Sequence, residues 1–237
     1  SEARQRAEAA AEAKGRFLAA ISHEIRTPMN AIIGLLEWLA GTPMATDQGR
    51  ALERVRMATD ELLGLLNDIL DFTRNESSRL ALTPQRVDLA LLCEQVVAIH
   101  WPKALDKGLR LSVRITPELP TTLWLDPHRV SQILHNLLSN AIKFTVHGEV
   151  RLRVSRDEAS LLLAVEDQGP GIDPALRPRL FLPFEQGLEA RRQGQGTGLG
   201  LAICHQLVTL MGGDIGVSER AVGSCFWCRL PLREAEH

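Results

Sequence analysis

A change in hydrophobic periodicity near Thr83-Pro84 constrains the fold of this chain more than any other feature of its sequence. Before that point, apolar residues recur at helical steps of three and four, and no segment alternates as a half-buried strand does. Beyond it, segments with strand-like alternation are interspersed with amphipathic helical segments. We therefore expect two domains, an all-helical one at residues 1–82 and a mixed one at residues 83–237.

The all-helical part is predicted to be a hairpin. A first helix reaches Leu39, residues 40–48 resemble a turn, and a second helical run extends from about Arg50 to Ser77. On a helical wheel the apolar residues of the first helix fall within a sector of about 100°. These residues are Phe17, Ile21, Ile25, Ile32, Leu36 and Leu39. The apolar residues of the second run are Leu52, Val55, Leu62, Leu66 and Ile69, with one gap at Thr59. One hairpin buries little surface, so two copies are expected to pair into a dimeric four-helix bundle.

The mixed part is predicted to be an α/β sandwich, with one mixed sheet and helices on one face, which makes the whole chain α+β. Helices are expected at residues 87–108, 127–143 and about 198–212. Strands are expected at residues 109–116, 121–126, 149–156, 160–167, 214–219 and 224–232.

Composition excludes some classes of function. The 237 residues are 45% apolar, which allows a sizeable core, and the net charge of −2 gives no bulk signal for nucleic acid or an anionic membrane. No run of about 18 apolar residues occurs, so no membrane contact is expected from this chain. The N-terminus is polar, has no signal-peptide core and lacks an initiator Met, so we expect a fragment of a longer protein.

The four cysteines are predicted to be reduced packing residues. Cys225 and Cys228 have C-x-x-C spacing, but they lie in a predicted strand, where residues three apart point to opposite faces. This spacing argues against a local disulfide or a metal site. Together with Cys93 and Cys204, they fit a reducing cytosolic setting.

His23 is predicted to face away from the apolar stripe of the first helix. It lies nearly opposite the centre of the stripe, on the same exposed side as Thr27 and Asn30. An exposed neutral imidazole is a competent nucleophile near neutral pH, and Glu24 would hold the proton of one ring nitrogen and leave the other free. Pro28 is expected to kink the helix one turn later. The alternative is a surface histidine with no role.

The predicted helix at residues 127–143 has a polar ridge opposite its apolar stripe. Asn136, Asn140 and Lys143 follow at steps of four and three. A carboxamide oxygen can ligate Mg²⁺, and an ammonium group neutralises phosphate charge. A solvated helix face is the alternative, although asparagine is a poor helix former. The apolar stripe consists of Val130, Ile133, Leu134, Leu137 and Ala141.

Two glycine-rich stretches favour nucleotide binding. In "EDQGPGI", Gly169 and Gly171 allow the backbone to approach a flat ring, and Asp167 can accept a hydrogen bond from an exocyclic amine. A tight turn after a strand is the alternative. In "GQGTGLGLAICHQLV", glycines precede a helix whose N-cap is predicted to be Thr197, and such a helix start can bind phosphate. Neither a Rossmann fingerprint nor a Walker loop is present.

The segment between these two stretches, residues 173–193, is long, charged and interrupted by prolines. This composition is typical of a mobile lid.

These stretches, in this order, resemble the sensor histidine kinases of two-component signalling, over about residues 10–233. "FLAAISHEIRTPMNAIIG" is similar to the phosphoacceptor box of that family, "NLLSNAIKFT" to its N box and "DQGPGI" to its first glycine box. "LFLPFEQ" is similar to the F box, "GTGLGL" to the second glycine box and "GSCFWCRLPL" to the closing strand. The string "SHEIRTPMN" resembles hybrid kinases, which carry a receiver domain further along, although no receiver lies within this chain.

The resemblance implies roles for individual residues. His23 would take the γ-phosphoryl group of ATP, Glu24 would orient or deprotonate the imidazole, and Thr27 would help to remove phosphate from the aspartate of a partner. Asn140, with Asn136, would hold Mg²⁺. The other implied nucleotide-binding residues are Lys143 for phosphate, Asp167 for the adenine amine, Gly169 and Gly171 beside the ring, and Gly196, Thr197, Gly198, Leu199 and Gly200 around the phosphates. Phe181 and Phe184 would anchor the lid.

The resemblance also implies partners: a second copy of the chain, a response-regulator receiver domain, and an upstream sensor domain in the full-length protein. No nucleic-acid partner is expected. A cytoplasmic location is expected for this fragment, and an inner-membrane anchor elsewhere in the full-length protein stays open. Two other classes remain as alternatives. One is an ATP-hydrolysing clamp like gyrase or the mismatch-repair ATPases, which lack the helical hairpin, and the other is a non-catalytic dimer that scaffolds signalling partners.

Overall fold

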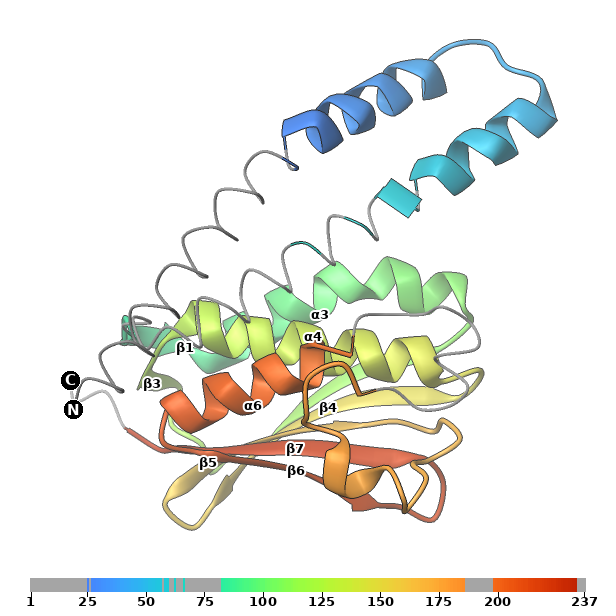
Figure 1. Cartoon of the computed structure of the whole chain (residues 1–237). Coiled ribbons are helices and arrows are strands. Elements are labelled where there is room, and N and C mark those ends of the chain that lie inside the picture. The colour runs from blue at the N-terminus through green and yellow to red at the C-terminus, as the bar shows by residue number, and fades with distance from the viewer. Residues whose placement is uncertain are drawn as a thin grey trace, which may run out of the picture. The chain divides into compact units, whose positions relative to one another are not determined.

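The structure is a computed structural model, and it describes residues 25, 27–56, 58–59, 62, 66, 82–185 and 198–233. The chain divides into two compact units, one formed mainly by residues 1–80 and the other mainly by residues 81–187 and 200–237 (Figure 1).

The described part of the first unit contains two helical stretches, residues 27–40 and 46–56, joined by a turn. Thr42 ends the first stretch, because its hydroxyl donates a hydrogen bond of 2.7 Å to the carbonyl of Leu39. The second stretch begins at residue 46, four residues earlier than predicted. The side-chain oxygen of Gln48 accepts a hydrogen bond of 3.0 Å from the backbone N–H of Ala45, which caps that start.

The predicted apolar stripe of the first helix is only partly buried. Leu36 is buried, and so is Met29, which lies just outside the predicted sector. Ile25, Ile32 and Leu39 remain 37%, 41% and 39% exposed. Phe17 and Ile21 lie outside the described residues, and a single chain, in which the stripe is partly exposed, does not test the prediction that paired hairpins bury it. The physical reason for this exposure is that a hairpin can cover only one side of a helix, so an apolar strip of Ile25, Ile32, Leu35, Trp38 and Leu39 is left at the surface.

The gap that the sequence shows at Thr59 is a buried position. Thr59 can be buried since its hydroxyl is satisfied: it donates a hydrogen bond of 2.8 Å to the carbonyl of Val55 within the same helix. Of the other apolar residues predicted for this helix, Leu52 and Leu66 are half-buried and Val55 and Leu62 are exposed. Ile69 lies outside the described residues.

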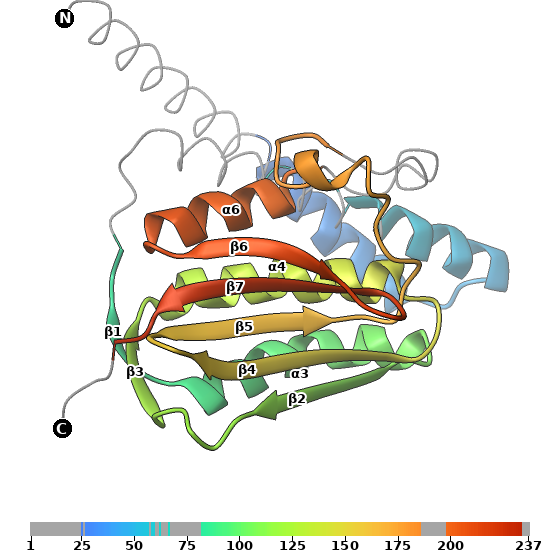
Figure 2. The same ribbon diagram turned by 90° about the horizontal axis from the view of Figure 1, so that it is seen from below.

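The second unit is a sandwich of helices on a mixed sheet. Its helices are α3 (Leu89–Asp106), α4 (Pro127–Phe144), the short 3₁₀ helix η1 (Arg177–Arg179) and α6 (Gly200–Leu210). Its strands are β1 (Gln85–Asp88), β2 (Arg110–Ile115), β3 (Thr122–Leu125), β4 (Glu149–Asp157), β5 (Ser160–Glu166), β6 (Asp214–Glu219) and β7 (Ser224–Pro231). Helices α3, α4 and α6 all lie on one face of the large sheet, as predicted (Figures 1 and 2).

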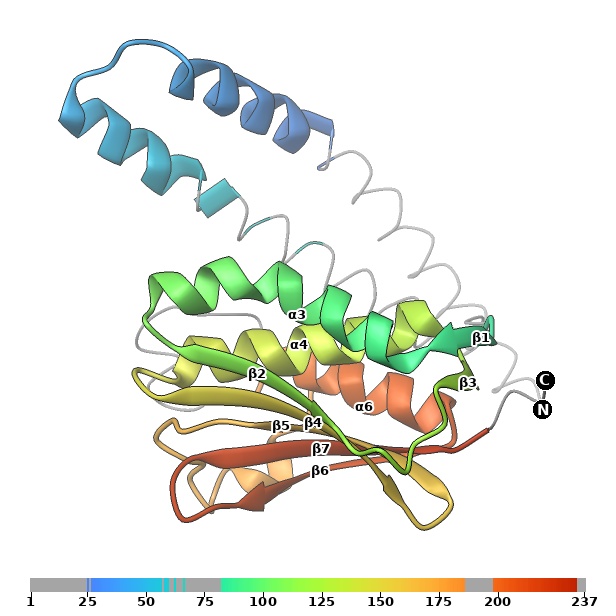
Figure 3. The same ribbon diagram turned by 180° about the vertical axis from the view of Figure 1, so that it is seen from behind.

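The large sheet has the strand order β2-β4-β5-β7-β6, in which the β2–β4 pair is parallel and the other pairs are antiparallel. The prediction of one sheet is incomplete, because β1 and β3 pair separately as a two-stranded antiparallel sheet beside it (Figure 3). Strand β1 also replaces the predicted start of a helix at Val87. Helix α3 begins only after Asp88, whose carboxylate accepts a hydrogen bond of 3.0 Å from the N–H of Leu91 as an N-cap.

Helix α4 forms the centre of the core. Asp126 caps its start by accepting bonds of 3.1 Å from the N–H groups of His128 and Arg129, and Pro127 occupies the first turn. The predicted apolar stripe is buried, and Leu138 and Ile142 are buried with it. Each fully buried leucine or isoleucine contributes about 1.5–3 kcal/mol through the hydrophobic effect. This packing fixes the helix, and the polar residues on its other side, against the sheet.

All four cysteines are free and buried, as predicted. Cys228 is fully buried close to Cys204 of α6, and burial raises the pKa of its thiol. Cys225 instead lines a hollow of about 340 Å³ with Arg153, Glu166 and Arg220. The two cysteines of the C-x-x-C spacing therefore lie on opposite faces of β7.

No helix among the described residues combines the length and the apolar character needed to cross a bilayer.

A pair of histidines joins α3 to α4. Nε2 of His100 lies 3.0 Å from Nδ1 of His135, and the two ring centroids are 5.1 Å apart. Burial, followed by the charges of His135 and Lys103, lowers the pKa of His100 from 6.5 to about 4. Burial also lowers the pKa of His135. The pair is therefore neutral at pH 7, and one ring donates to the other.

This pair predicts a pH-dependent stability. Between pH 6.5 and pH 4 the unfolded chain binds more protons at His100 than the folded chain does, so stability falls as the pH falls through this range. After allowance for the partial exposure of the ring, we expect the wild-type chain to lose about 1–2 kcal/mol more than His100→Gln between pH 7 and pH 4.5. Urea unfolding followed by circular dichroism at both pH values measures this difference. Equal losses in the two proteins would contradict the prediction.

Candidate functional site

The turn after β5 holds a buried carboxylate. Asp167 is only 5% exposed, and its Oδ1 accepts a hydrogen bond of 2.8 Å from the N–H of Gly169. A side chain at Gly169 would meet this carboxylate at 3.0 Å and the carbonyl oxygen of Phe144 at 3.2 Å. Gly171 has a φ of 79°, in the left-handed region that favours glycine. The structure therefore brings the three predicted residues of this turn together, against the carboxyl end of α4.

Two residues at the start of β7 complete this turn, and neither was assigned a role from the sequence. Ser224 donates from its hydroxyl to Oδ2 of Asp167 and from its N–H to Oδ1, at 3.3 Å. Gly223 has a φ of 78°, and a Cβ there would lie 2.0 Å from the carbonyl oxygen of Asp167. The available signal was the Gly-Ser pair at the start of the closing strand. A hydrogen-bonded carboxylate at this depth presents fixed acceptor atoms to a ligand.

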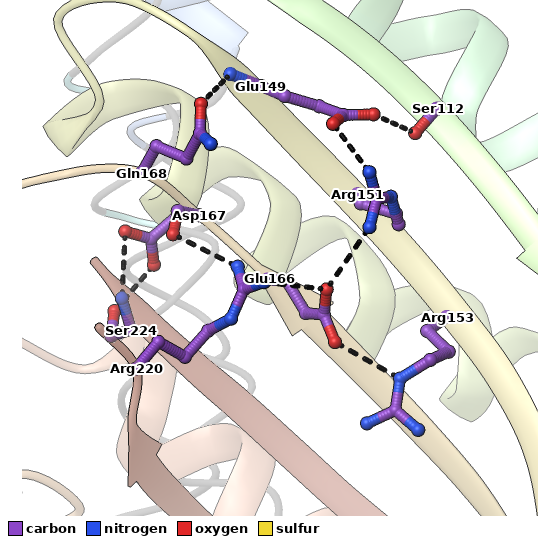
Figure 4. A network of polar contacts seen from close by, with 9 residues as sticks. All are labelled: Ser112, Glu149, Arg151, Arg153, Glu166, Asp167, Gln168, Arg220 and Ser224. Carbon is purple, nitrogen blue, oxygen red and sulfur yellow. Dashed lines mark hydrogen bonds and ion pairs between the residues drawn. The ribbon is translucent and has the colours of Figure 1, made fainter. Parts of the chain in front are cut away.

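A network of charges supports the turn from the other face of the sheet (Figure 4). Glu166, which precedes Asp167, has arginine nitrogens on three sides: Arg153 at 3.1 Å, Arg220 at 3.3 Å and Arg151 at 3.7 Å. Its side chain is only 12% exposed, so these contacts are partly shielded from solvent.

The same network reaches the backbone of the turn. Arg220 also donates a hydrogen bond of 3.5 Å to the carbonyl of Asp167. Gln168 accepts a bond of 2.8 Å from the N–H of Glu149 on β4. The network therefore ties the turn after β5 to β4 and to the β6–β7 connection.

The polar ridge of α4 lies where the sequence predicts it. Asn136, Asn140 and Lys143 are half-buried, in contrast to the fully buried apolar stripe of the same helix. Nδ2 of Asn136 donates a hydrogen bond of 3.3 Å to the carbonyl of Gly200, the first residue of α6. The ridge therefore connects the carboxyl end of α4, beside the Asp167 turn, with the amino end of α6.

The amino end of α6 is a potential anion site. The helix starts at Gly200 instead of near Gly198, where φ is 71°, and Leu199 is buried. Free N–H groups and the helix dipole favour negative charge at such an end. Two predicted residues of this stretch, Gly196 and Thr197, lie outside the described residues. Because the helix starts at Gly200, the residue before it is Leu199, so the predicted N-cap at Thr197 is wrong.

The segment predicted to be a lid is described as far as Glu185. It contains η1, and Arg177 forms an ion pair with Glu219 of β6. The ring of Phe181 lies 6.1 Å from the ring of His205 on α6. Phe184, by contrast, is 63% exposed and has a φ of 64°. Of the two predicted anchors, Phe181 therefore lies against α6 through its ring, whereas the side chain of Phe184 is largely exposed.

The residues predicted for the chemical step are in the first unit. His23 and Glu24 lie outside the described residues. Thr27 is described, and it is exposed at the start of the helical stretch 27–40, as its position on the wheel predicts.

The arrangement in the second unit fits an adenine nucleotide with a hard divalent cation. A buried carboxylate can read an amine, a helix start can take phosphate, and amide oxygens on the ridge between them suit Mg²⁺. Among the described residues, no three His, Cys, Asp or Glu side chains are grouped as metal ligands. A cation here would therefore share phosphate oxygens and waters with the amide.

Two family models match the chain. Residues 13–78 match the His Kinase A (phospho-acceptor) domain, and residues 125–234 match the histidine kinase-, DNA gyrase B- and HSP90-like ATPase. The first match contains His23 and the second contains the whole α4 ridge and both glycine stretches.

Curated relatives and solved structures agree with these models. Sensor histidine kinase RcsC of Escherichia coli K12 is 41% identical over 235 residues, which cover 98% of this chain and 25% of that protein. Sensor protein TorS of the same organism is 40% identical over 237 residues, which cover 99% of this chain and 26% of that protein. The chain thus spans about a quarter of the length of these relatives.

Among solved structures, full-length ShkA in complex with AMPPNP has a TM-score of 0.78 and 35% identity, over 94% of this chain and 47% of that one. The histidine kinase AdeS of Acinetobacter baumannii has a TM-score of 0.64 and 25% identity, over 90% of this chain and 98% of that one.

The fit of Gly223 under the Asp167 turn gives a testable prediction. Gly223→Ala forces a Cβ against a backbone oxygen, whereas Gly108→Ala, at a φ of 67°, meets no atom within 4 Å. Both variants have to place alanine in the left-handed region, which costs about 1–2 kcal/mol. Gly223→Ala should cost a further 1–3 kcal/mol or so, because the turn must move. Urea unfolding of the two variants measures the difference, and equal destabilisation would show that the close approach is unimportant.

Proposed function

This chain belongs to the sensor histidine kinases, and we propose that it uses ATP to phosphorylate its own His23. One observation carries the proposal: the Asp167 turn lies against the carboxyl end of α4, and the start of α6 is bonded to Asn136 on the same helix. In the proposal, the carboxylate that reads adenine and the helix end that binds phosphate lie at the two ends of one ridge of amides. The match of residues 13–78 to a phospho-acceptor domain supports His23 as the acceptor.

The second unit binds the nucleotide in this proposal. Asp167, held by Ser224, accepts a hydrogen bond from the adenine amine, with Gly169 and Gly171 beside the ring. Lys143 neutralises phosphate charge. The backbone from Gly196 to Gly200, including Thr197 and Leu199, surrounds the phosphates at the start of α6.

Asn140, with Asn136 beside it, holds Mg²⁺ in this proposal, and the cation neutralises charge on the phosphate oxygens. Phe184 belongs to the lid over the nucleotide.

The chemical step transfers the γ-phosphoryl group of ATP from its bridging oxygen to a nitrogen of His23. The free imidazole nitrogen of His23 attacks the γ-phosphorus, an N–P bond forms, and the bond to the bridging oxygen breaks, so ADP leaves. Glu24 holds the proton of the other ring nitrogen and stabilises the charge that develops on the ring. The phosphoryl group then passes to an aspartate of a response-regulator receiver domain, and exposed Thr27 assists its later hydrolysis.

Pairing of two hairpins is part of the proposal. The exposed apolar strip of the first unit is costly in water and would be covered by a second copy in a four-helix bundle. Residues 1–82 form the dimerisation and phosphotransfer domain, and residues 83–237 the ATP-binding domain. An upstream sensor domain in the longer protein would act through the first helix, and a cytoplasmic location suits a receiver as partner.

An ATP-hydrolysing clamp of the gyrase type is disfavoured by the phospho-acceptor match, because such clamps lack the preceding hairpin. A scaffold without catalysis is separated from a kinase by the labelling experiment below.

Incubation with γ-labelled ATP and Mg²⁺ should label the chain, and His23→Gln should abolish the label. The wild-type label should be acid-labile and alkali-stable, as expected for a phosphorus–nitrogen bond. His147→Gln, an exposed histidine of the second unit, serves as the control and should be labelled normally. Label that survives His23→Gln would overturn the assignment, and a wild-type chain that binds ATP without labelling would favour the scaffold.

The adenine-reading role of Asp167 predicts a selective loss of binding. Asp167→Asn should raise the Kd for AMPPNP at least about tenfold, because the amide no longer presents two acceptor oxygens to Ser224 and the adenine amine. Asp157→Asn, which alters a carboxylate bonded to Arg229 at the far end of β4, is the matched control and should bind normally. Isothermal titration calorimetry measures both. Unchanged affinity in Asp167→Asn would contradict the assigned role.

A further inference from the structure

The side chain of Lys107 is bonded to the carboxyl end of α4. Lys107 directly follows α3, and its Nζ donates hydrogen bonds to the carbonyl oxygens of Ile142 at 2.7 Å, Lys143 at 2.9 Å and Thr145 at 3.1 Å. An ammonium group has three donor hydrogens, so these three oxygens match its full capacity. The proposed phosphoryl transfer assigns no role to this lysine.

The location of these oxygens explains why a cation binds there. The last carbonyls of a helix have no intrahelical partner, and they form the negative end of the helix dipole. Thr145, the C-cap residue of α4, is itself bonded back to Ala141 through its N–H at 3.0 Å and its hydroxyl at 2.7 Å. Lys107 supplies donors to the neighbouring carbonyls, so the end of α4 is held by a residue 36 positions from Lys143 in the chain.

This end of α4 is in contact with the proposed adenine turn. The carbonyl oxygen of Phe144, between two of the oxygens that Lys107 binds, lies 3.2 Å from the place of a Cβ on Gly169. The chain beyond α4 is tied to the same turn, because the N–H of Glu149 donates to Gln168. Because the helix end and the turn approach this closely and are linked through Gln168, a displacement of the helix end would be transmitted to the Asp167 turn.

The same helix carries the proposed metal ligand. Asn140 lies one turn before Lys143, whose carbonyl is bound by Lys107, and the Lys143 ammonium lies over the ring of Phe144 at 5.1 Å. The position of the helix end thus sets where the amide ridge lies relative to the carboxylate of Asp167.

We propose that Lys107 is a positioning residue of the nucleotide site: by binding the terminal carbonyls of α4, it fixes the metal-binding ridge and the adenine turn relative to each other. The inference rests on the proposed ATP site and adds a residue that contacts neither nucleotide nor metal. Its effect is on affinity for the intact nucleotide, because adenine and the metal-bound phosphates must be engaged at the same time.

The test compares AMPPNP binding in Mg²⁺ by calorimetry at a temperature where circular dichroism shows each protein folded. Lys107→Met removes the donors and should raise the Kd about fivefold or more. Lys103→Met removes an equal charge one turn earlier on α3, where the described residues show no hydrogen bond to α4, and should leave the Kd within twofold of wild type. Lys107→Gln keeps two N–H donors without the charge and should give an intermediate Kd.

The outcomes separate positioning from general stability. A Lys107→Met protein with a lower melting temperature but the wild-type Kd would show that the lysine is only a helix cap, and would overturn the inference. If Lys107→Met does not fold, Lys107→Gln decides in the same way. In labelling assays the positioning role predicts a raised KM for ATP with little change in kcat. A wild-type chain that fails to bind AMPPNP would overturn the proposed function itself, and this inference would fall with it.

Discussion

The candidate site depends on the hydrogen bonding of the buried Asp167 carboxylate. A carboxylate at this depth has to be hydrogen-bonded, and its partners come from the next turn of chain and from the start of β7. The antiparallel register that pairs Glu166 with Cys225 brings Ser224 beside Asp167, and the N–H of Asp167 donates to the carbonyl of Ser224 at 2.9 Å. The absence of a side chain at Gly223 lets the two backbones approach.

Helix α4 turns this local arrangement into a binding surface. One side of the helix is buried in the core and the other presents amides, so its rotation about its own axis is fixed by packing. Its two ends are tied to different parts of the unit: the start through Asp126, which accepts a hydrogen bond of 2.8 Å from the N–H of Thr83, and the carboxyl end through Lys107. The unit therefore holds the groups proposed to read adenine, to bind the metal and to bind phosphate on helices and strands that are packed together. The histidine proposed as the phosphoryl acceptor, His23, belongs to the other unit.

Local patterns were reliable where one segment carries its own signals. Helix α4 begins at Pro127 as predicted, because the cap, the proline and the helical stripe agree, and β2, β4, β5, β6 and β7 follow from alternation and turn residues. Strand β1 was missed because four residues with one buried position, Val87, give no periodicity. For the first helix, periodicity shows which residues avoid water and not which partner covers them, so the burial of the whole stripe by a second hairpin stays a prediction.

The sequence by itself determined the family motifs, the order of the elements and the residues that line the ridge and the turns, because each depends on neighbours within a few positions. Only the tertiary structure decided that Ser224 binds Asp167 across 57 residues, that Arg220 supports the same turn, and that Lys107 holds the end of α4. These partners are set by strand register and by the packing of helices on the sheet. A serine, an arginine or a lysine has the same local signature whether it is bonded to a distant backbone or to water.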